Sequence, residues 1–326
     1  MTRVRVGIVS WNTGPLLGRC LDALPAALAG IDAEIRVVDN ASSDGSVDVA
    51  AGHPGVEVVR NDENLGYARA MNQALAGAGA DVLIALNPDT EPGPGTLATL
   101  VERLLADPDV ALVVPRLVYP DGRLQHSVFR FPSPRQAAAV LLVSPRRLRG
   151  DHGKRWWADG YHPHDRSTDI DWAIGAVHVL RAAALHGDPY DERWFMYVED
   201  VDCCWQLARR GWRRRLEADV EVAHVSNAAG AQAWGDERTR RWTIATYDWY
   251  LRTFGPAALR RWAAVHSLAV VALMGRELPR GLRGDPVARG WLRELWRLLP
   301  LQAGPMVSGA VATEGRVAGP PIVARR

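Results

Sequence analysis

The stretch "VRVGIVSWNTGPLLGRCLDALPAAL" (residues 4–28) contains the first strand and the first helix of the fold. Residues 4–11 are a short run rich in β-branched residues, which is typical of a buried strand. Residues 14–28 place leucines at helical spacing, and Pro15 suits the first turn of a helix. A strand followed directly by a helix is the repeating unit of an α/β protein.

The same alternation continues along the next sixty residues. The turn and helix-cap residues "ASSDGS" (41–46) separate two of the predicted strands. Strands are predicted at 34–40, 56–60 and 81–87, and a helix at 64–78. Because the strands are apolar on both faces, we expect a mostly parallel central sheet flanked by helices. Ligands of such a sheet bind beyond the carboxyl ends of its strands.

Composition and charge exclude several classes of protein. The 326 residues are 48% hydrophobic and 23% charged, as in a globular chain, and the net charge of +2 argues against a dedicated nucleic-acid binder. Three cysteines form no disulfide framework, which favours a reducing compartment. The N-terminus is too short an apolar run for a signal peptide, and the longest apolar run, 262–275, is too short to span a bilayer. We therefore expect a cytoplasmic protein.

Polar residues collect at the carboxyl ends of the predicted strands. Neither G-x-G-x-x-G nor G-x-x-x-x-G-K-[ST] follows the first strand, so no glycine nest for phosphates is predicted there. Carboxylates would repel a bare diphosphate, so we expect Mg²⁺ or Mn²⁺ between them. Asp39 is a suitable acceptor for the imide N–H of uracil or thymine. The residues at these ends are Trp11, Asn12, Asp39, Asn40, "NDENLGYAR" (61–69) and "NPDTEP" (87–92).

The stretch "WFMYVEDVDCCWQLARRGW" (194–212) places Glu199, Asp200 and Asp202 within four positions. An apolar, aromatic approach that ends in acids indicates a strand or loop that delivers carboxylates to a cleft. The alternative is that the three acids only cap the helix that follows them.

Together these motifs resemble family 2 glycosyltransferases, and most closely the bacterial rhamnosyltransferase-like branch. The resemblance covers roughly residues 4–230 and rests on motifs that occur in the family's order. It implies a GT-A α/β fold and an inverting enzyme that moves one sugar, with rhamnose as the candidate, from a nucleotide diphosphate sugar. The motifs are "VSWNTGPLLGRCLDAL", "VVDNASSDGS", "NLGYARAMNQAL", "LNPDT" and "DERWFMYVEDVD".

The resemblance implies roles on the donor side of the site. Asp39 reads the base, Gly66 lets the backbone approach the nucleotide, and Arg69 reaches the nucleotide or its phosphate. Asp89 stands in the position of the family's D-x-D motif and is expected to bind the metal. His224 is expected to complete the metal site. The remaining residues implied in nucleotide-sugar binding are Ser10, Trp11, Asn12, Asn40 and Asn87.

The resemblance also implies roles on the acceptor side. Asp200 takes the position of the general base, and Glu199 binds the acceptor or holds Asp200 in place. Asp202 is expected to cap the following helix. The segment "DWAIGA" (171–176) fits an acceptor-side wall, with Trp172, Gly175 and Ala176 as its binding residues.

Two departures from the family pattern affect the inference of the donor's identity more than the inference of the reaction class. Gln206 stands where an arginine is common, and Asn87 replaces one acid of the metal motif. The expected donor is dTDP- or UDP-linked, and the expected acceptor is a glycan or a polyprenyl-linked sugar. One alternative is a sugar nucleotidylyltransferase, but the Gly-rich basic loop of such an enzyme is missing here. The other is a non-catalytic carbohydrate-binding protein, and the retained Asp200 and Asp89 argue against it.

The expected organisation is a GT-A catalytic domain over 1–235, with a nucleotide-sugar half (1–120) and an acceptor half (121–235). A helical extension over 236–300 and a disordered tail over 301–326 follow. The extension mixes Trp262, Trp291 and Trp296 with many arginines. It either packs on the catalytic domain or docks on anionic lipid, as a peripheral contact with the inner face of the cell membrane.

Overall fold

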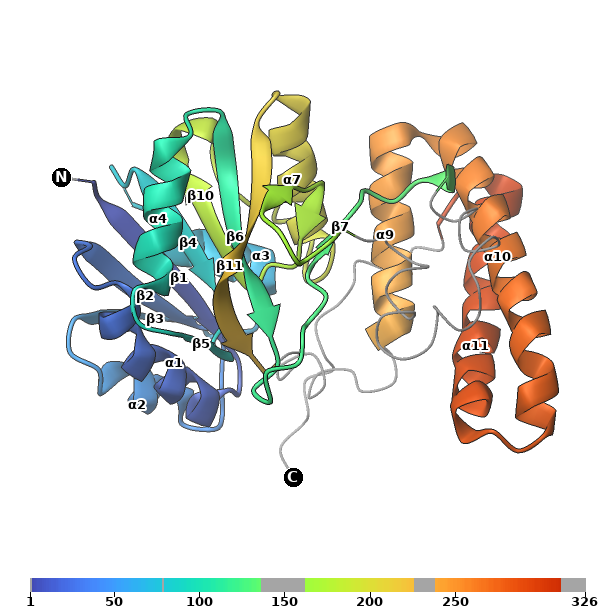
Figure 1. Ribbon diagram of the computed structural model, residues 1–326, viewed down its shortest axis with the longest axis horizontal. Coiled ribbons are helices and arrows are strands. Elements are labelled where there is room, and N and C mark those ends of the chain that lie inside the picture. The colour runs from blue at the N-terminus through green and yellow to red at the C-terminus, as the bar shows by residue number, and fades with distance from the viewer. Residues whose placement is uncertain (1, 78, 136–161, 226–237, 312–326) are drawn as a thin grey trace. The chain divides into compact units, whose positions relative to one another are not determined.

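Figure 1 shows the computed structural model of the chain, which describes residues 2–77, 79–135, 162–225 and 238–311. The described residues fall into two compact units. The first comprises residues 2–129 and 162–225, and the second comprises 130–135 and 238–311.

The first unit is built on one large sheet whose strands lie in the order β3-β2-β1-β4-β10-β6-β11-β5, with β8 paired to β11. The first four strands in this order are parallel, as the sequence predicts. The sheet as a whole is mixed, because β10 runs antiparallel to both of its neighbours and β5 runs antiparallel to β11. The strands are β1 (Val4–Ser10), β2 (Ala33–Asp39), β3 (Val56–Arg60), β4 (Val82–Leu86), β5 (Thr90–Pro92), β6 (Val110–Val118), β8 (Thr168–Asp169), β10 (Val177–Arg181) and β11 (Arg213–His224). A separate pair joins β7 (Val128–Phe129) to β9 (Trp172–Ala173).

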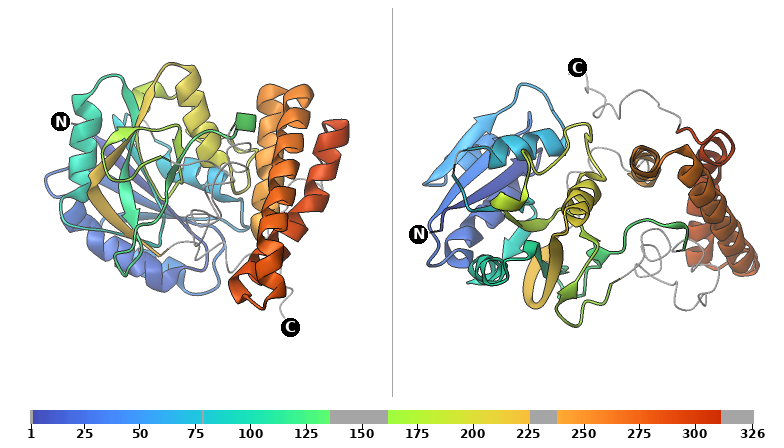
Figure 2. Two further views of the ribbon diagram at one scale, coloured as in Figure 1. Left: turned by 45° about the vertical axis from the view of Figure 1, so that its right-hand side comes forward. Right: turned by 90° about the horizontal axis from the view of Figure 1, so that it is seen from above.

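Helices cover both faces of this sheet (Figures 1 and 2). On one face, α1 (Gly14–Ala27), α2 (Ser46–Ala51) and α4 (Thr96–Ala106) enclose the main apolar core with the buried valines and leucines of the strands. On the other face lie α3 (Tyr67–Leu75) and α7 (Glu199–Arg209). A Cβ at Gly7 would lie 2.8 Å from the Leu75 side chain, so glycine on β1 lets α3 approach the sheet closely. A short 3₁₀ helix, η1 (Ala182–Ala184), follows β10.

The strand directions bring the predicted site residues to one edge of the sheet. Ser10 at the end of β1 pairs with Asp39 at the end of β2, and β4 ends beside them. Because β10 is antiparallel to both β4 and β6, and β11 is parallel to β6, His224 at the end of β11 faces the same edge as Asn87 after β4. Carboxyl ends of strands gathered in this way form the usual ligand-binding edge of an α/β sheet.

The second unit contains α9 (Arg238–Phe254), α10 (Pro256–Leu282) and α11 (Pro286–Ser308), which pack against one another. Trp262 of α10 stacks on Tyr250 of α9 with ring centroids 4.5 Å apart, and Tyr247 Oη lies 2.8 Å from His266 Nδ1. These aromatic contacts form the core between the two helices.

The prediction of a disordered tail from residue 301 is wrong for its first part, because α11 continues to Ser308. Pro300 and Pro305 lie inside this helix, and prolines normally interrupt helices. Gln302 and Pro305 are buried, and α11 packs along α10, so tertiary packing maintains the helix past both prolines. Residues 312–326 of the predicted tail lie outside the described residues.

Candidate active site

Asp39 presents an unused acceptor at the sheet edge. The carboxylate is buried, and its Oδ2 accepts a hydrogen bond from the Ser42 backbone N–H (3.0 Å). Its Oδ1 is also buried and has no hydrogen-bond partner among the described residues. Buried carboxylate oxygens are costly to leave unpaired, so an oxygen in this state is suited to a ligand that brings its own N–H. Beside it, Ser10 is fully buried and bonds to Thr13 Oγ1 (2.9 Å).

The loops after β1 and β2 are joined by hydrogen bonds. Asn12 has a φ of 53°, its backbone N–H donates to Ser42 Oγ (3.0 Å), and its Oδ1 accepts from the Ser43 N–H (2.8 Å). The Gly14 N–H donates to Asp44 Oδ2 (2.9 Å). Asn12 therefore shapes the wall of the nucleotide side rather than offering its Oδ1 to a ligand. Trp11 lies in the same loop and is half-buried.

Asn40 organises the loop after β3. Its Nδ2 donates to Asn64 Oδ1 (2.8 Å) and to the Gly66 carbonyl (3.3 Å). Its Oδ1 accepts from Asn61 Nδ2 (3.1 Å) and from the Leu65 N–H (3.0 Å). The amide is thus used within the protein, and its contribution to a nucleotide site is to hold the 61–66 loop.

A second group of contacts links the start of α3 to the approach of α7. Gly66 has a φ of 85°, and a Cβ there would lie 2.5 Å from the Phe195 carbonyl oxygen. The Tyr67 N–H donates to the same carbonyl (2.7 Å). The Tyr67 hydroxyl donates to the Gly175 carbonyl (3.0 Å), and the Gly175 N–H donates to Asp200 Oδ2 (3.2 Å). The close approach that was predicted for Gly66 is made to the protein's own backbone at Phe195.

The two leading acids of α7 differ in their environments. Burial raises the pKa of Asp200 to about 6, against the opposing effect of hydrogen bonds from the Val201 and Gly175 N–H groups. Burial, and then the charge of Asp200, raise the pKa of Glu199 well above its usual value. Glu199 Oε2 forms no hydrogen bond within the described residues. The raised pKa makes the Asp200 carboxylate a stronger base than that of an ordinary aspartate.

The backbone before these acids is strained. Tyr197 and Val198 have φ values of 71° and 63°, and the left-handed region is unfavourable for a β-branched residue. The predicted strand or loop that delivers the acids is this strained turn. The helix begins at Glu199, and its N-cap is Val198, which makes no side-chain hydrogen bond. The expectation that Asp202 caps the helix is therefore wrong, because Asp202 already lies within the first helical turn.

Asp89 and His224 form a buried pair at the same edge. The antiparallel register of β5 and β11 aligns Thr90 with His224, so Asp89 Oδ1 lies 3.2 Å from His224 Nε2. His224 Nδ1 lies 2.8 Å from Gln125 Oε1, and because an amide oxygen only accepts, Nδ1 carries the proton. In the neutral ring Nε2 then presents a lone pair, and it makes no hydrogen bond within the described residues.

This arrangement fits one divalent cation. An imidazole lone pair beside a carboxylate oxygen is a two-ligand donor set, and a histidine ligand whose other nitrogen is hydrogen-bonded is the usual arrangement at a metal. No cluster of three or more metal-ligating side chains occurs in the part of the chain that the structure describes. Two protein ligands with the remaining positions taken by phosphate and water is a common way to bind Mg²⁺ or Mn²⁺.

Asp200 and the pair at Asp89 belong to one electrostatic neighbourhood. Burial, followed by the charges of Glu199, Asp200 and Asp89, raises the pKa of Tyr67 well above its usual value. All three carboxylates therefore act on a single phenol. The acids that the sequence predicts at residues 89 and 199–200, more than a hundred positions apart, are thus close enough for their charges to act on the same side chain.

The other predicted site residues are placed differently. Arg69 extends from α3 toward Glu192, with the guanidinium Nε 3.8 Å from the carboxylate. Trp172 is buried and stacks on Phe129 at 4.7 Å, so its ring belongs to the support of the predicted acceptor wall. The Asn87 N–H donates to the Ala176 carbonyl (2.9 Å), which joins the metal-side loop to that wall.

Three contributors were missed by the sequence reasoning. Tyr67 donates to the Gly175 carbonyl, whose N–H in turn donates to Asp200, and Gln125 orients His224. His178 is buried with its pKa lowered to about 4, and it bonds to Tyr190 Oη and to the Ala173 carbonyl (3.1 Å each). Tyr67 lies inside the quoted motif "NLGYARAMNQAL", but Gln125 and His178 follow no pattern that would have indicated them.

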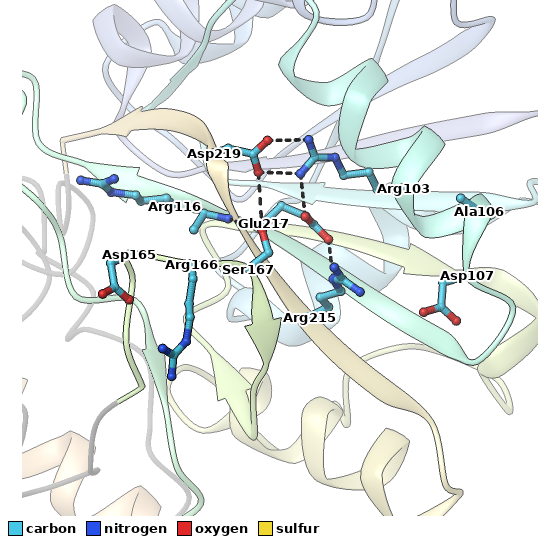
Figure 3. A pocket seen from close by; sticks show the side chains of 11 residues that line it. Arg103, Ala106, Asp107, Arg116, Asp165, Arg166, Ser167, Arg215, Glu217 and Asp219 are labelled. Atoms are coloured by element: carbon cyan, nitrogen blue, oxygen red, sulfur yellow. Dashed lines mark hydrogen bonds and ion pairs between the residues drawn. The ribbon is translucent and has the colours of Figure 1, made fainter.

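A cavity of about 770 Å³ lies elsewhere in the first unit, between α4 and β11 (Figure 3). Arg103 contacts both Glu217 and Asp219 at 2.6 Å, and Arg215 lies 2.8 Å from Glu217. None of the predicted site residues lines this cavity. Because these two carboxylates are paired with arginines of the protein, we assign the cavity no part in the chemistry.

A family model described as "Glycosyl transferase family 2" matches residues 5–168, half of the chain. The chain belongs to glycosyltransferase family 2. The resemblance inferred from the motifs is thereby confirmed, and the protein is a glycosyltransferase.

Two curated relatives and one solved structure extend this comparison. An N-acetylglucosaminyl-diphospho-decaprenol L-rhamnosyltransferase of Mycobacterium tuberculosis is 28% identical over 229 residues, which cover 66% of this chain and 74% of that protein. A pre-mycofactocin glycosyltransferase of the same species is 28% identical over 284 residues, 81% of this chain and 55% of that protein. The mannosyltransferase PcManGT from Pyrobaculum calidifontis, solved with GDP-Man and Mn²⁺, superposes with a TM-score of 0.55 at 20% identity, covering 94% of this chain and 87% of that one. The predicted GT-A fold, with a helical C-terminal region, is confirmed.

Proposed function

We propose that this glycosyltransferase moves a single sugar, rhamnose, from a dTDP- or UDP-linked donor to a hydroxyl of a glycan or polyprenyl-linked acceptor, with inversion. The observation that carries the proposal is that Asp200, bonded to Gly175, and the buried pair of Asp89 and His224 lie at the strand edge that also offers the free acceptor of Asp39. The choice of sugar and acceptor rests on the relative named as a rhamnosyltransferase for a decaprenol-linked substrate.

The chemistry follows from the state of Asp200. The acceptor hydroxyl gives its proton to the Asp200 carboxylate as its oxygen forms a bond to the anomeric carbon. The bond from that carbon to the diphosphate breaks, and the nucleoside diphosphate leaves with the electron pair. Attack opposite the leaving group inverts the anomeric configuration. A divalent cation held by Asp89 and His224 would neutralise charge on the leaving diphosphate.

The base-reading role of Asp39 can be tested by substitution. Asp39→Ala should weaken binding of uridine or thymidine diphosphate by about 1–3 kcal/mol, because the imide N–H loses its buried partner. Asp39→Asn should bind these nucleotides as weakly as Asp39→Ala. Its amide oxygen can accept from the Ser42 N–H, but its NH₂ group would then face the imide N–H, and two donors cannot form a hydrogen bond. Calorimetric titration measures both. Equal affinity of the wild-type protein for guanosine and thymidine diphosphates would contradict this role.

Tyr67→Phe tests the connection between the wall and the base. Removing the hydroxyl frees the Gly175 carbonyl and loosens the N–H that Gly175 donates to Asp200. Losing a hydrogen bond to the charged form raises a carboxyl pKa, so the acid limb of the kcat/KM profile, expected near pH 6 in the wild type, should move to higher pH. The loss at neutral pH should be roughly threefold to tenfold, from a bond worth about 0.5–1.5 kcal/mol.

Tyr190→Phe is the matched control for this variant. It removes another buried hydroxyl of the same region, which bonds to His178 and has no hydrogen bond to Gly175 or Asp200. Its pH profile should keep the wild-type acid limb. An acid limb that is unchanged in Tyr67→Phe, or shifted equally in both variants, would remove the assigned role of Tyr67.

We also propose that the protein works in the cytoplasm, at the inner face of the cell membrane, where a polyprenyl-linked acceptor would reside. No transfer step depends on this placement. It concerns only where donor and acceptor meet, and the helices of the second unit bear on it below.

Thermal-shift screening of nucleotide sugars with and without Mn²⁺ tests the donor class directly, because a ligand that binds the folded state raises the melting temperature. We expect the largest shift with dTDP-rhamnose and Mn²⁺ together. Donor turnover with a series of acceptors then separates transfer from hydrolysis. Stabilisation by a nucleoside triphosphate and a sugar phosphate, with release of pyrophosphate, would favour a nucleotidylyltransferase instead.

A further inference from the structure

Helix α10 carries an exposed apolar stripe on one face. Leu268, Val271, Leu278 and Leu282 have exposed fractions of 63, 55, 49 and 76%, and with Gly275 they follow spacings of three and four residues. Residues at these spacings lie on one side of a helix. A run of large exposed side chains on one helix face marks an interaction surface rather than scattered surface residues.

The opposite face of α10 is already occupied. Trp262, Ala263, Ala269, Val270 and Leu273 are buried against the other helices of the unit, and α10 and α11 lie side by side (Figure 2). By length and composition alone α10 could cross a membrane, which corrects the expectation from the run 262–275, but more than a third of its apolar window is buried in the protein. A helix held in a bundle by one face can meet lipid only with the other, so it is suited to lie on a membrane.

The net charge of residues 238–311, which contain α9, α10 and α11, is opposite in sign to that of the rest of the chain. Residues 238–311 contain twelve arginines and four acidic residues, a net charge of +8, so the remaining residues carry −6 to give the total of +2. Arg261 precedes the stripe by seven residues on the same helix face, and Arg283 directly follows Leu282. Apolar side chains bordered by arginines are the composition of helices that bind anionic bilayers.

We propose that the exposed stripe of α10, formed by Leu268, Val271, Leu278 and Leu282, docks on an anionic lipid surface. The leucines enter the boundary between headgroups and acyl chains, and the arginines at the ends of the stripe meet lipid phosphates. This inference names the surface that would hold the enzyme at the proposed membrane location, and its biological role rests on the proposed function. Vesicle binding itself requires neither donor nor acceptor.

The docking surface differs from the one expected from the tryptophans. Trp262 has an exposed fraction of only 3% and stacks on Tyr250, so it cannot lie in the membrane interface. Trp291 is half-buried against the core between α10 and α11. Trp296 is 67% exposed, and of the three it is the one with most of its surface available to lipid.

Co-sedimentation of the full chain with vesicles tests the proposal. The wild-type protein should pellet at 0.05 M salt with vesicles of equal parts phosphatidylglycerol and phosphatidylcholine, and little with phosphatidylcholine alone. At 0.5 M salt its binding to the anionic vesicles should fall on the order of tenfold, because salt shortens the Debye length from roughly 14 Å to 4 Å. Leu268→Gln with Leu282→Gln should lower the partition coefficient at least tenfold. Both positions are exposed, so the bundle should stay folded, which circular dichroism checks.

Leu105→Gln, an exposed leucine on α4 of the first unit, is the matched control and should bind vesicles as the wild type does. Wild-type protein that stays in the supernatant with anionic vesicles at 0.05 M salt overturns the proposal. So does a dimer in lipid-free solution that the double glutamine variant dissociates, because the stripe would then be covered by a second copy. Failure of sugar transfer with intact vesicle binding would instead contradict the proposed function alone.

Discussion

Asp200→Asn is expected to reduce sugar transfer by about 10²-fold or more, the range for removing a general base. The amide cannot take the acceptor proton. Its single oxygen can accept from either the Gly175 or the Val201 N–H, which in the wild type bond to Oδ2 and Oδ1 respectively. One of the two contacts is kept and the side chain keeps its size, so donor binding should change little. Steady-state kinetics with a saturating acceptor measures the loss, and calorimetry with nucleoside diphosphate measures binding.

Asp202→Asn is the matched control, since it makes the same change in the same helical turn, at a buried acid that the mechanism does not use. It should retain most activity. Glu199→Gln separates two roles of the neighbouring acid: if Glu199 binds the acceptor, KM for the acceptor rises, and if it positions Asp200, kcat falls and the acid limb moves. Transfer by Asp200→Asn at a rate near that of the wild type would show that another group is the base.

Asp89→Ala is expected to remove most activity together with its dependence on divalent metal. Asp89 offers the one carboxylate of the pair, and without it the diphosphate would face the acids around Tyr67 with no fixed cation. His224→Ala should act in the same direction but more mildly, because the carboxylate remains. Titration of Mn²⁺ against activity, and calorimetry of Mn²⁺ in the presence of nucleoside diphosphate, measure both.

Gln125→Ala gives this assignment an independent check. Gln125 fixes the tautomer of His224 by accepting a hydrogen bond from Nδ1 (2.8 Å). Gln125→Ala should therefore weaken Mn²⁺ binding by about 10–100-fold, as loss of such a supporting hydrogen bond typically does. Thr99→Ala, which removes a hydroxyl of α4 that donates to the carbonyl of Gly95 at the N-cap, should leave the metal titration unchanged. Mn²⁺ curves that are identical for wild type, Asp89→Ala and His224→Ala would exclude the metal site.

Local sequence patterns predicted the first half of the sheet well. The strand at 56–60 has the predicted bounds, and the helix after β1 begins at Gly14 with Pro15 in its first turn. These elements are short, strongly apolar and bounded by turn residues, so neighbouring residues alone determine them. The helix predicted from residue 64 begins at Tyr67 instead, because Gly66 adopts a positive φ where it meets the Phe195 backbone.

The sequence by itself determined the residue types that the chemistry needs and their order: acids at 39, 89 and 199–200, each after an apolar run. Tertiary structure decided which of their atoms are available. The state of Asp39 Oδ1, the raised pKa of Asp200 and the lone pair of His224 Nε2 each depend on burial and on partners distant in the chain, such as Gly175 and Gln125. A pattern of neighbouring residues contains no information on such contacts, because solvent exclusion and hydrogen bonding across strands arise only when the sheet is assembled.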